Sequence, residues 1–126
     1  MRPGAFWPEE CGRGRRCVDA GADLVADITE PLNLSGYRTA TAFGVLEHIP
    51  EEALDGVLAN LAACPRFVVT IHNGPARRWI GRQLHITRLP WPEWRMRLAR
   101  SLVIEGEREA WPSRDGRLRL FYGRAR

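Results

Sequence analysis

The chain has 126 residues, 44% of them hydrophobic and 27% charged, which is enough for one small globular domain with a buried core. The formal net charge is +4 and all the basic residues are arginine, a balance that permits an acidic or nucleic-acid partner without requiring one. No apolar run reaches the length of a signal peptide or a membrane span, so we expect a cytoplasmic protein that does not associate with membranes.

The first stretch, residues 1–16, is rich in proline, glycine and arginine and shows no apolar period. We therefore expect an N-terminal arm or loop rather than a packed element. Within it, Gly12 and Gly14 are one residue apart, a spacing that lets backbone N–H groups approach an anionic ligand. A flexible linker explains the same two glycines, and both interpretations stay open.

Two short apolar segments follow, at 17–20 and 23–28, and both are expected to be strands. Asp19 and Asp27 stand at or near the C-terminal ends of these segments. Neighbouring strands would place the two carboxylates along one edge of a sheet. On the pattern alone, they are equally well ordinary aspartates of strand ends or turns.

The central feature of the sequence is the segment 40–50, where small and apolar residues run directly into the polar pair Glu47 and His48. We expect a strand over 40–46, then a helix over 51–63 that opens with proline. Ligands of open α/β sheets bind at the carboxyl ends of the strands. His48 is therefore the best candidate for a catalytic base, because its unperturbed pKa lies near neutrality. A histidine that caps the strand end by hydrogen bonds is the alternative.

A second central strand, adjacent to the one at 40–46, is predicted at 66–71, where a continuous apolar run is typical of a parallel strand buried on both faces. His72 and Asn73 follow this run directly. We expect them at the same edge of the sheet as Glu47 and His48, which makes them candidates for substrate binding.

The last third of the chain predicts one helix and two strands, at 92–101, 102–109 and 117–123. The dipeptide Asp115-Gly116 between the two strands is typical of a hairpin turn. An antiparallel hairpin is therefore expected to close the sheet.

Several of these segments resemble one known family. Residues 45–50, Val-Leu-Glu-His-Ile-Pro, resemble the strand-four motif of class I S-adenosylmethionine-dependent methyltransferases. Residues 21–32 resemble the stretch around the second and third strands in compact members of that family. The motif His-Ile-Thr at 85–87, followed by Trp94, is similar to the start of the last helix in many small methyltransferases.

The resemblance implies a single α/β domain over residues 1–126: a reduced, Rossmann-like class I methyltransferase sheet, mainly parallel, with a C-terminal antiparallel hairpin. The family's first strand and the helix after its glycine loop are shortened or missing in this chain, so the domain is truncated relative to the family pattern. A sheet without those elements exposes a strand edge and apolar surface, and we therefore expect a homodimer or a partner protein.

The resemblance also implies S-adenosyl-L-methionine as the cofactor. The residues expected to bind it are Gly12, Gly14, Asp19, Asp27, Ile28 and Glu47. Asp19 is expected to accept hydrogen bonds from the ribose hydroxyls, since a carboxylate only accepts, and Asp27 and Ile28 are expected to flank the adenine. The two glycines are expected near the amino-acid portion. A competing alignment makes 18–22 the remnant of the glycine motif, and the sequence does not decide between the two.

The implied function is methyl transfer from S-adenosylmethionine to an unidentified acceptor, with a small molecule favoured and with His48 facing the acceptor. In such a reaction the cofactor carries the reactive methyl group, while the protein supplies positioning and a base. The alternative function is that of a catalytically inactive methyltransferase-like module that binds or assembles with a partner, which completes its pocket.

No metal site is expected from the sequence. The three cysteines include no Cys-x-x-Cys pair, so neither a disulfide framework nor a zinc knuckle is favoured. No two of the three histidines have the i, i+4 spacing of metal ligands on a helix, which argues against a site that combines them with Glu47.

Overall fold

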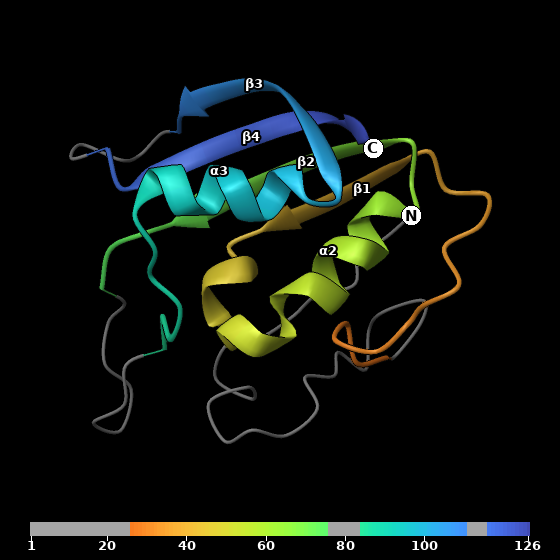
Figure 1. Cartoon of the computed structure of the whole chain (residues 1–126), viewed down its shortest axis with the longest axis horizontal. Coiled ribbons are helices and arrows are strands. Elements are labelled where there is room, and N and C mark those ends of the chain that lie inside the picture. The colour runs from red at the N-terminus through yellow and green to blue at the C-terminus, as the bar shows by residue number, and fades with distance from the viewer. Residues whose placement is uncertain (1–25, 76–83, 111–115) are drawn as a thin grey trace.

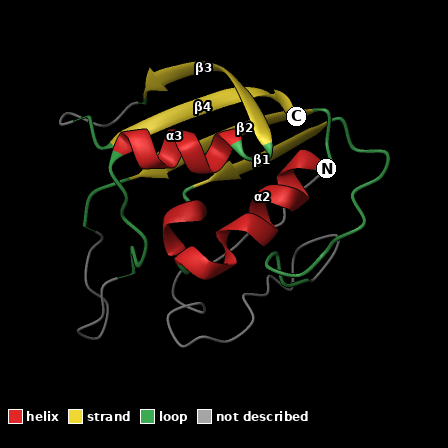
Figure 2. Cartoon of the chain, in the orientation of Figure 1, coloured by secondary structure: helices red, strands yellow, loops and turns green. Residues whose placement is uncertain are grey.

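The computed structural model describes residues 26–75, 84–110 and 116–126, which form a four-stranded mixed sheet with two helices on one face (Figure 1, Figure 2). The strands are β1 (Thr39–Phe43), β2 (Arg66–His72), β3 (Leu102–Glu109) and β4 (Leu118–Ala125). The helical elements are the 3-10 turns η1 (Leu46–His48) and η2 (Glu51–Ala53) and the α-helices α2 (Leu54–Ala62) and α3 (Trp91–Ala99). Within these ranges, no helix is both long enough and apolar enough to cross a membrane.

The strands lie in the order β1-β2-β4-β3. β1 and β2 are parallel neighbours, with Ala40 beside Phe67 and Phe43 beside Thr70. β4 is antiparallel to both of its neighbours, β2 and β3. Consequently β3 points in the same direction as β1 and β2, although it pairs with neither of them.

The prediction of a mainly parallel sheet is not confirmed. Only the pairing of β1 with β2 is parallel, whereas the two pairings made by β4 are antiparallel. The reason is that the chain returns after β3 as an antiparallel strand that inserts beside β2, so every ladder hydrogen bond at that side of the sheet is antiparallel. The predicted closing pair of antiparallel strands and the predicted adjacency of the strands at 40–46 and 66–71 are both confirmed.

The predicted strands at the start of the chain are tested only at 26–28. The strand at 17–20, the arm at 1–16 and the first part of the segment 23–28 lie outside the described residues. Residues 26–28 form no strand. Instead, the Asp27 Oδ1 accepts hydrogen bonds from the Thr29 amide at 2.9 Å and the Thr29 hydroxyl at 2.7 Å, and this local turn replaces strand pairing.

The predicted boundaries of the other elements are close to the observed ones. β1 ends at Phe43 rather than at residue 46, because Gly44 adopts a φ of +66° and turns the chain out of the strand. The predicted helix over 51–63 begins with η2 and continues as α2. The strand predicted at 102–109 is confirmed with the same bounds.

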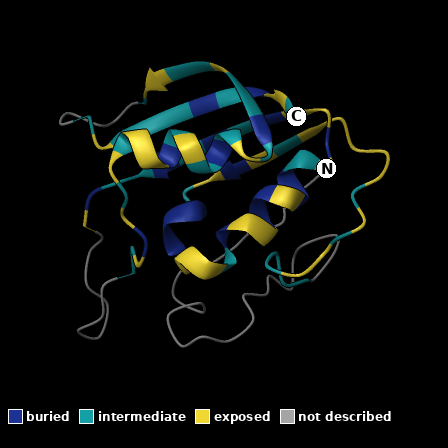
Figure 3. Ribbon diagram, viewed as in Figure 1, coloured by how far each residue is buried: buried dark blue, intermediate teal, exposed yellow. Residues whose placement is uncertain are grey.

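The hydrophobic core lies between the sheet and the two helices (Figure 3). In β2 the side chains of Phe67, Val69 and Ile71 are buried, while Val68 and Thr70 between them are only half-buried. The strand is therefore covered fully on one face, and the prediction of burial on both faces is wrong. The buried side chains that α2 and α3 add to this core are Leu54, Val57, Leu58, Leu61, Trp94 and Leu98.

Candidate functional site

The candidate site begins at the turn that follows β1. The Gly44 amide donates hydrogen bonds to the side-chain hydroxyl of Thr70 at 3.0 Å and to its carbonyl oxygen at 3.3 Å. These contacts hold the turn against β2, and η1 starts directly after it. Glu47 and His48 are thereby fixed beside the carboxyl end of β2, where His72 lies.

Glu47 is a buried acid, with only 1% of its surface exposed. Its Oε1 accepts a hydrogen bond from the His72 amide at 3.3 Å, whereas Oε2 has no hydrogen-bond partner among the described residues. Burial raises the pKa of Glu47 from 4.5 to about 7, and hydrogen bonds from its own amide and the His72 amide limit this rise. The carboxyl group can therefore take up or release a proton near neutral pH.

His48 and His85 are each held by a backbone carbonyl. The Nδ1 of His48 lies 2.8 Å from the Leu84 carbonyl oxygen, and the Nδ1 of His85 lies 2.6 Å from the Gly74 carbonyl oxygen. Since a carbonyl oxygen only accepts, each Nδ1 carries the proton, and Nε2 is the acceptor atom of each neutral ring.

The pKa of His85 is lowered, chiefly by burial, and the charges of His72 and Arg88 lower it further. The contact with the Gly74 carbonyl opposes this shift. The neutral form of the His85 ring is therefore favoured at neutral pH.

The three histidines form one cluster, with His85 between the other two. Its ring centroid is 4.9 Å from that of His48, at an interplanar angle of 68°, and 4.9 Å from that of His72, at 53°. The Nδ1 atoms of His72 and His85 are 3.3 Å apart. One candidate ligand atom from each of Glu47, His48 and His85 lies within 4.8 Å of the other two, a spacing from which these residues could hold a metal ion.

Thr87 fixes the segment that carries His85. Its amide donates to the Glu47 carbonyl oxygen at 3.1 Å, and its hydroxyl donates to the Ile49 carbonyl oxygen at 2.6 Å. Thr87 is 4% exposed, so these hydrogen bonds are shielded from water. Thr87 and His85 are not among the predicted site residues. The sequence signals at these positions are the His-Ile-Thr motif and, for His85, the combination of the three histidines with Glu47 that helical spacing argued against.

Asn73, a predicted substrate-binding residue, is engaged within the fold. Its Nδ2 donates to the Leu89 carbonyl oxygen at 2.5 Å, and its Oδ1 accepts from the Trp94 Nε1 at 3.1 Å. These bonds tie the end of β2 to the start of α3. The predicted role of Asn73 toward a substrate stays a prediction.

Apart from Glu47, the predicted cofactor-binding residues fall into two groups. Gly12, Gly14 and Asp19 lie outside the described residues. Asp27 and Ile28 belong to a turn that packs on α2, where the Asn60 Nδ2 donates to the Ile28 carbonyl oxygen at 2.8 Å.

Glu47 and His48 are thus the predicted residues that the structure brings together with His72 at one edge of the sheet. No family model, curated protein or solved structure matches this chain.

Proposed function

We propose that this chain is an S-adenosylmethionine-dependent methyltransferase that acts on an unidentified acceptor, with a small molecule favoured. The observation that carries the proposal is the parallel pairing of β1 with β2, which sets Glu47, His48 and His72 side by side at the carboxyl ends of two neighbouring strands. Ligands of open α/β sheets bind at this edge.

The sheet supports a reduced Rossmann-like methyltransferase fold as part of the same proposal. The class I resemblance implies an antiparallel hairpin at the far edge of the sheet, and β3 and β4 form an antiparallel pair on the side away from β1. The three strands β1, β2 and β3 share one direction, so that β4 alone is reversed.

In the proposed reaction, the sulfonium of the cofactor carries the methyl group and the protein removes a proton from the acceptor. His48 is the proposed base, and Glu47, with its pKa of about 7, is a second group able to exchange a proton there. Asp19 is proposed to bind the ribose, Asp27 and Ile28 to flank the adenine, and the glycines of the first stretch to lie near the amino-acid portion.

The test is calorimetric titration of S-adenosylmethionine and S-adenosylhomocysteine into the full chain. We expect Asp19→Ala to weaken binding about ten- to hundredfold, because it removes an acceptor for the ribose hydroxyls. Asp55→Ala is the matched control, since Asp55 is an exposed aspartate of α2, and it should bind like the wild type. Absence of binding at millimolar ligand would contradict the proposal.

Asp27 needs a second variant, because its carboxylate also holds the turn to Thr29. Asp27→Asn keeps an oxygen acceptor for that turn but removes the charge, whereas Asp27→Ala removes both. If both variants bind the cofactor like the wild type, Asp27 is not part of the cofactor site.

The catalytically inactive module is the second candidate function. It is favoured by the contacts of Asn73 and Asp27, whose side chains serve the fold itself in the described structure. Failure of the wild type to bind S-adenosylmethionine would leave this function in place of the enzyme, alone or completed by a second copy or a partner protein.

A further inference from the structure

We propose that Glu47, His48 and His85 bind one divalent transition-metal ion, of the kind represented by Zn²⁺. The ion would occupy the Nε2 of His48, so metal binding and the role of His48 as the base in methyl transfer exclude each other, and the metal site does not rest on the proposed function. It departs from the expectation drawn from helical spacing, because the three ligands come from two separate segments that the fold brings together.

The geometry of the three groups suits a metal ion. Their candidate ligand atoms all lie within 4.8 Å of one another. Ligand atoms around a tetrahedral zinc ion are about 3.4 Å apart, given bonds of about 2.1 Å. The separations in the cluster therefore exceed the bound value by at most about 1.4 Å, a difference that small side-chain shifts can close.

The surroundings of the two histidines are those of metal ligands. In most metal sites a ligating imidazole donates its other ring N–H to a backbone carbonyl or a carboxylate, which fixes the ring and its tautomer. Here the Nδ1 atoms of His48 and His85 contact the carbonyl oxygens of Leu84 and Gly74. Both rings are thus held in the tautomer whose Nε2 can bind a cation.

A second observation points to the same ion. The Glu47 Oε2 is buried and has no hydrogen-bond partner among the described residues. A buried acceptor without a partner is unfavourable by about 1–3 kcal/mol, and such groups in native proteins call for an explanation. A cation between Glu47 and the two Nε2 atoms supplies the missing partner.

The donor set indicates the class of metal. Two imidazole nitrogens and one carboxylate oxygen form the ligand set of several catalytic zinc sites, where the fourth position stays open for water or substrate. Oxygen-rich sites suit Mg²⁺ and Ca²⁺ better. His72 is not one of the three proposed ligands, although its ring contacts the ring of His85.

The experiment is titration of Zn²⁺, Co²⁺ and Mg²⁺ into the chelator-treated full chain by calorimetry, with the absorption spectrum of the Co²⁺ form. We expect one Zn²⁺ or Co²⁺ per chain, much weaker Mg²⁺ binding, and a cobalt spectrum without thiolate charge-transfer bands. Glu47→Gln and His85→Gln should each weaken Zn²⁺ binding at least about 100-fold, since even outer partners of metal ligands contribute 10–100-fold.

Two control variants test whether Glu47, His48 and His85 are the metal ligands. Glu52→Gln makes the same chemical change at an exposed glutamate and should bind Zn²⁺ like the wild type. His72→Gln alters a ring that contacts the ligand His85 and should weaken Zn²⁺ binding by about 10-fold, the lower end of what an outer partner contributes and below the loss of a ligand.

The proposal is overturned if the wild type binds no Zn²⁺ at millimolar concentration or if the cobalt form shows thiolate bands. Unchanged Zn²⁺ affinity in a folded Glu47→Gln or His85→Gln variant would overturn it as well. An effect of His72→Gln as large as that of His85→Gln would contradict the choice of these three ligands.

Discussion

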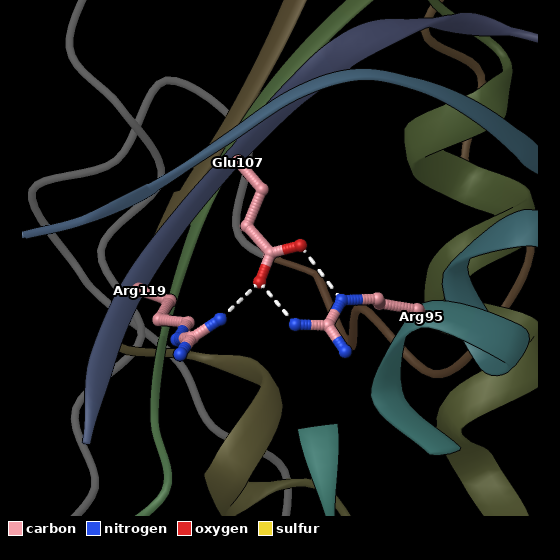
Figure 4. Close-up of polar contacts among 3 residues, drawn as sticks. All are labelled: Arg95, Glu107 and Arg119. Carbon is pink, nitrogen blue, oxygen red and sulfur yellow. Dashed lines mark hydrogen bonds and ion pairs between the residues drawn. The ribbon is translucent and has the colours of Figure 1, made fainter. Parts of the chain in front are cut away.

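Glu47 and Glu107 are both glutamates of the described chain, yet their carboxylates have opposite surroundings. The Glu107 carboxylate, on β3, accepts hydrogen bonds from Arg95 of α3 at 2.7 Å to each oxygen, and from Arg119 of β4 at 2.5 Å (Figure 4). The carboxyl group of Glu47 is buried, faces histidines, and has one oxygen without a partner. The first group is fully paired and the second is not.

The pKa values follow this difference. The Arg95 hydrogen bond, aided by Arg119, lowers the pKa of Glu107, whereas burial raises the pKa of Glu47 to about 7. A paired carboxylate that joins α3 to the hairpin holds the fold together. A buried carboxyl group that is not fully paired is a candidate for chemistry, because a fold alone gains nothing from leaving its oxygen unsatisfied.

The largest change in stability is expected when the buried carboxyl group of Glu47 is removed and stability is measured in metal-free buffer. A raised folded-state pKa means that the contribution of Glu47 to stability is fully present below pH 4.5 and is lost as the pH rises through about 7. Glu47→Gln should therefore be more stable than the wild type above pH 7, by up to about 3 kcal/mol.

Urea unfolding at several pH values, with a chelator present, measures this difference. His48, His72 and His85 lie around Glu47, so the informative quantity is the difference between wild type and Glu47→Gln, in which any contribution of the histidines cancels. A difference that stays constant from pH 4 to pH 8 would show that Glu47 does not titrate within the fold.

A smaller loss of stability is expected from a substitution at Gly44, in the turn before Glu47. Gly44 has a φ of +66° and Gly36 a φ of +90°, so alanine at either position is strained by about 1–2 kcal/mol. A Cβ on Gly44 would lie 3.8 Å from the Glu47 Oε1, an ordinary contact, whereas one on Gly36 would meet nothing within 4 Å. Thermal unfolding should give similar losses for Gly44→Ala and Gly36→Ala. Only Gly44→Ala should also weaken Zn²⁺ binding, because it shifts the turn that positions Glu47.

The contribution of Glu107 to stability should have the opposite pH dependence to that of Glu47, and its effect should be smaller than that of Gly44→Ala. A lowered folded-state pKa means that Glu107 contributes stability above its unfolded value, and that this contribution is lost as the pH falls through the folded value. Glu107→Gln should lower the midpoint of thermal unfolding near pH 7 by less than about 5 °C. Its loss of stability on acidification should be shallower than that of the wild type, and an equal slope would show that the ion pairs do not contribute.

Much of the fold and part of the candidate site could be predicted from the sequence, but only where the signal is local. The bounds of β3 and the adjacency of β1 and β2 follow from apolar patterns and turn residues close in sequence. Glu47 and His48 could be placed at a strand end for the same reason. His85 could not be joined to them, because its position depends on the hydrogen bond from Thr87 to Ile49, the residue after η1, across a gap of 38 residues. No periodicity encodes such a contact.

The same limit applies to the polar side chains at the end of β2. The edge position of Asn73 follows from the strand pattern, but the direction of its amide depends on Trp94 and Leu89, which belong to a later segment. The burial that raises the pKa of Glu47 likewise arises from the packed fold and not from neighbours in sequence.

The smallest change in stability is expected from Arg95→Lys, which keeps the positive charge but loses the two parallel N–H donors of the guanidinium group. Arg95 donates through two nitrogens to the two oxygens of Glu107, and a lysine ammonium reproduces only one such contact. Because Arg95 is partly exposed and Arg119 continues to bind the same carboxylate, thermal unfolding should change by less than about 2 °C. In the Glu107→Gln background the same substitution should have no further effect, since the charged partner is already gone. An equal loss in both backgrounds would mean that Arg95 stabilises α3 through its alkyl chain rather than through Glu107, and the contrast between the two glutamates would then rest on Arg119 alone.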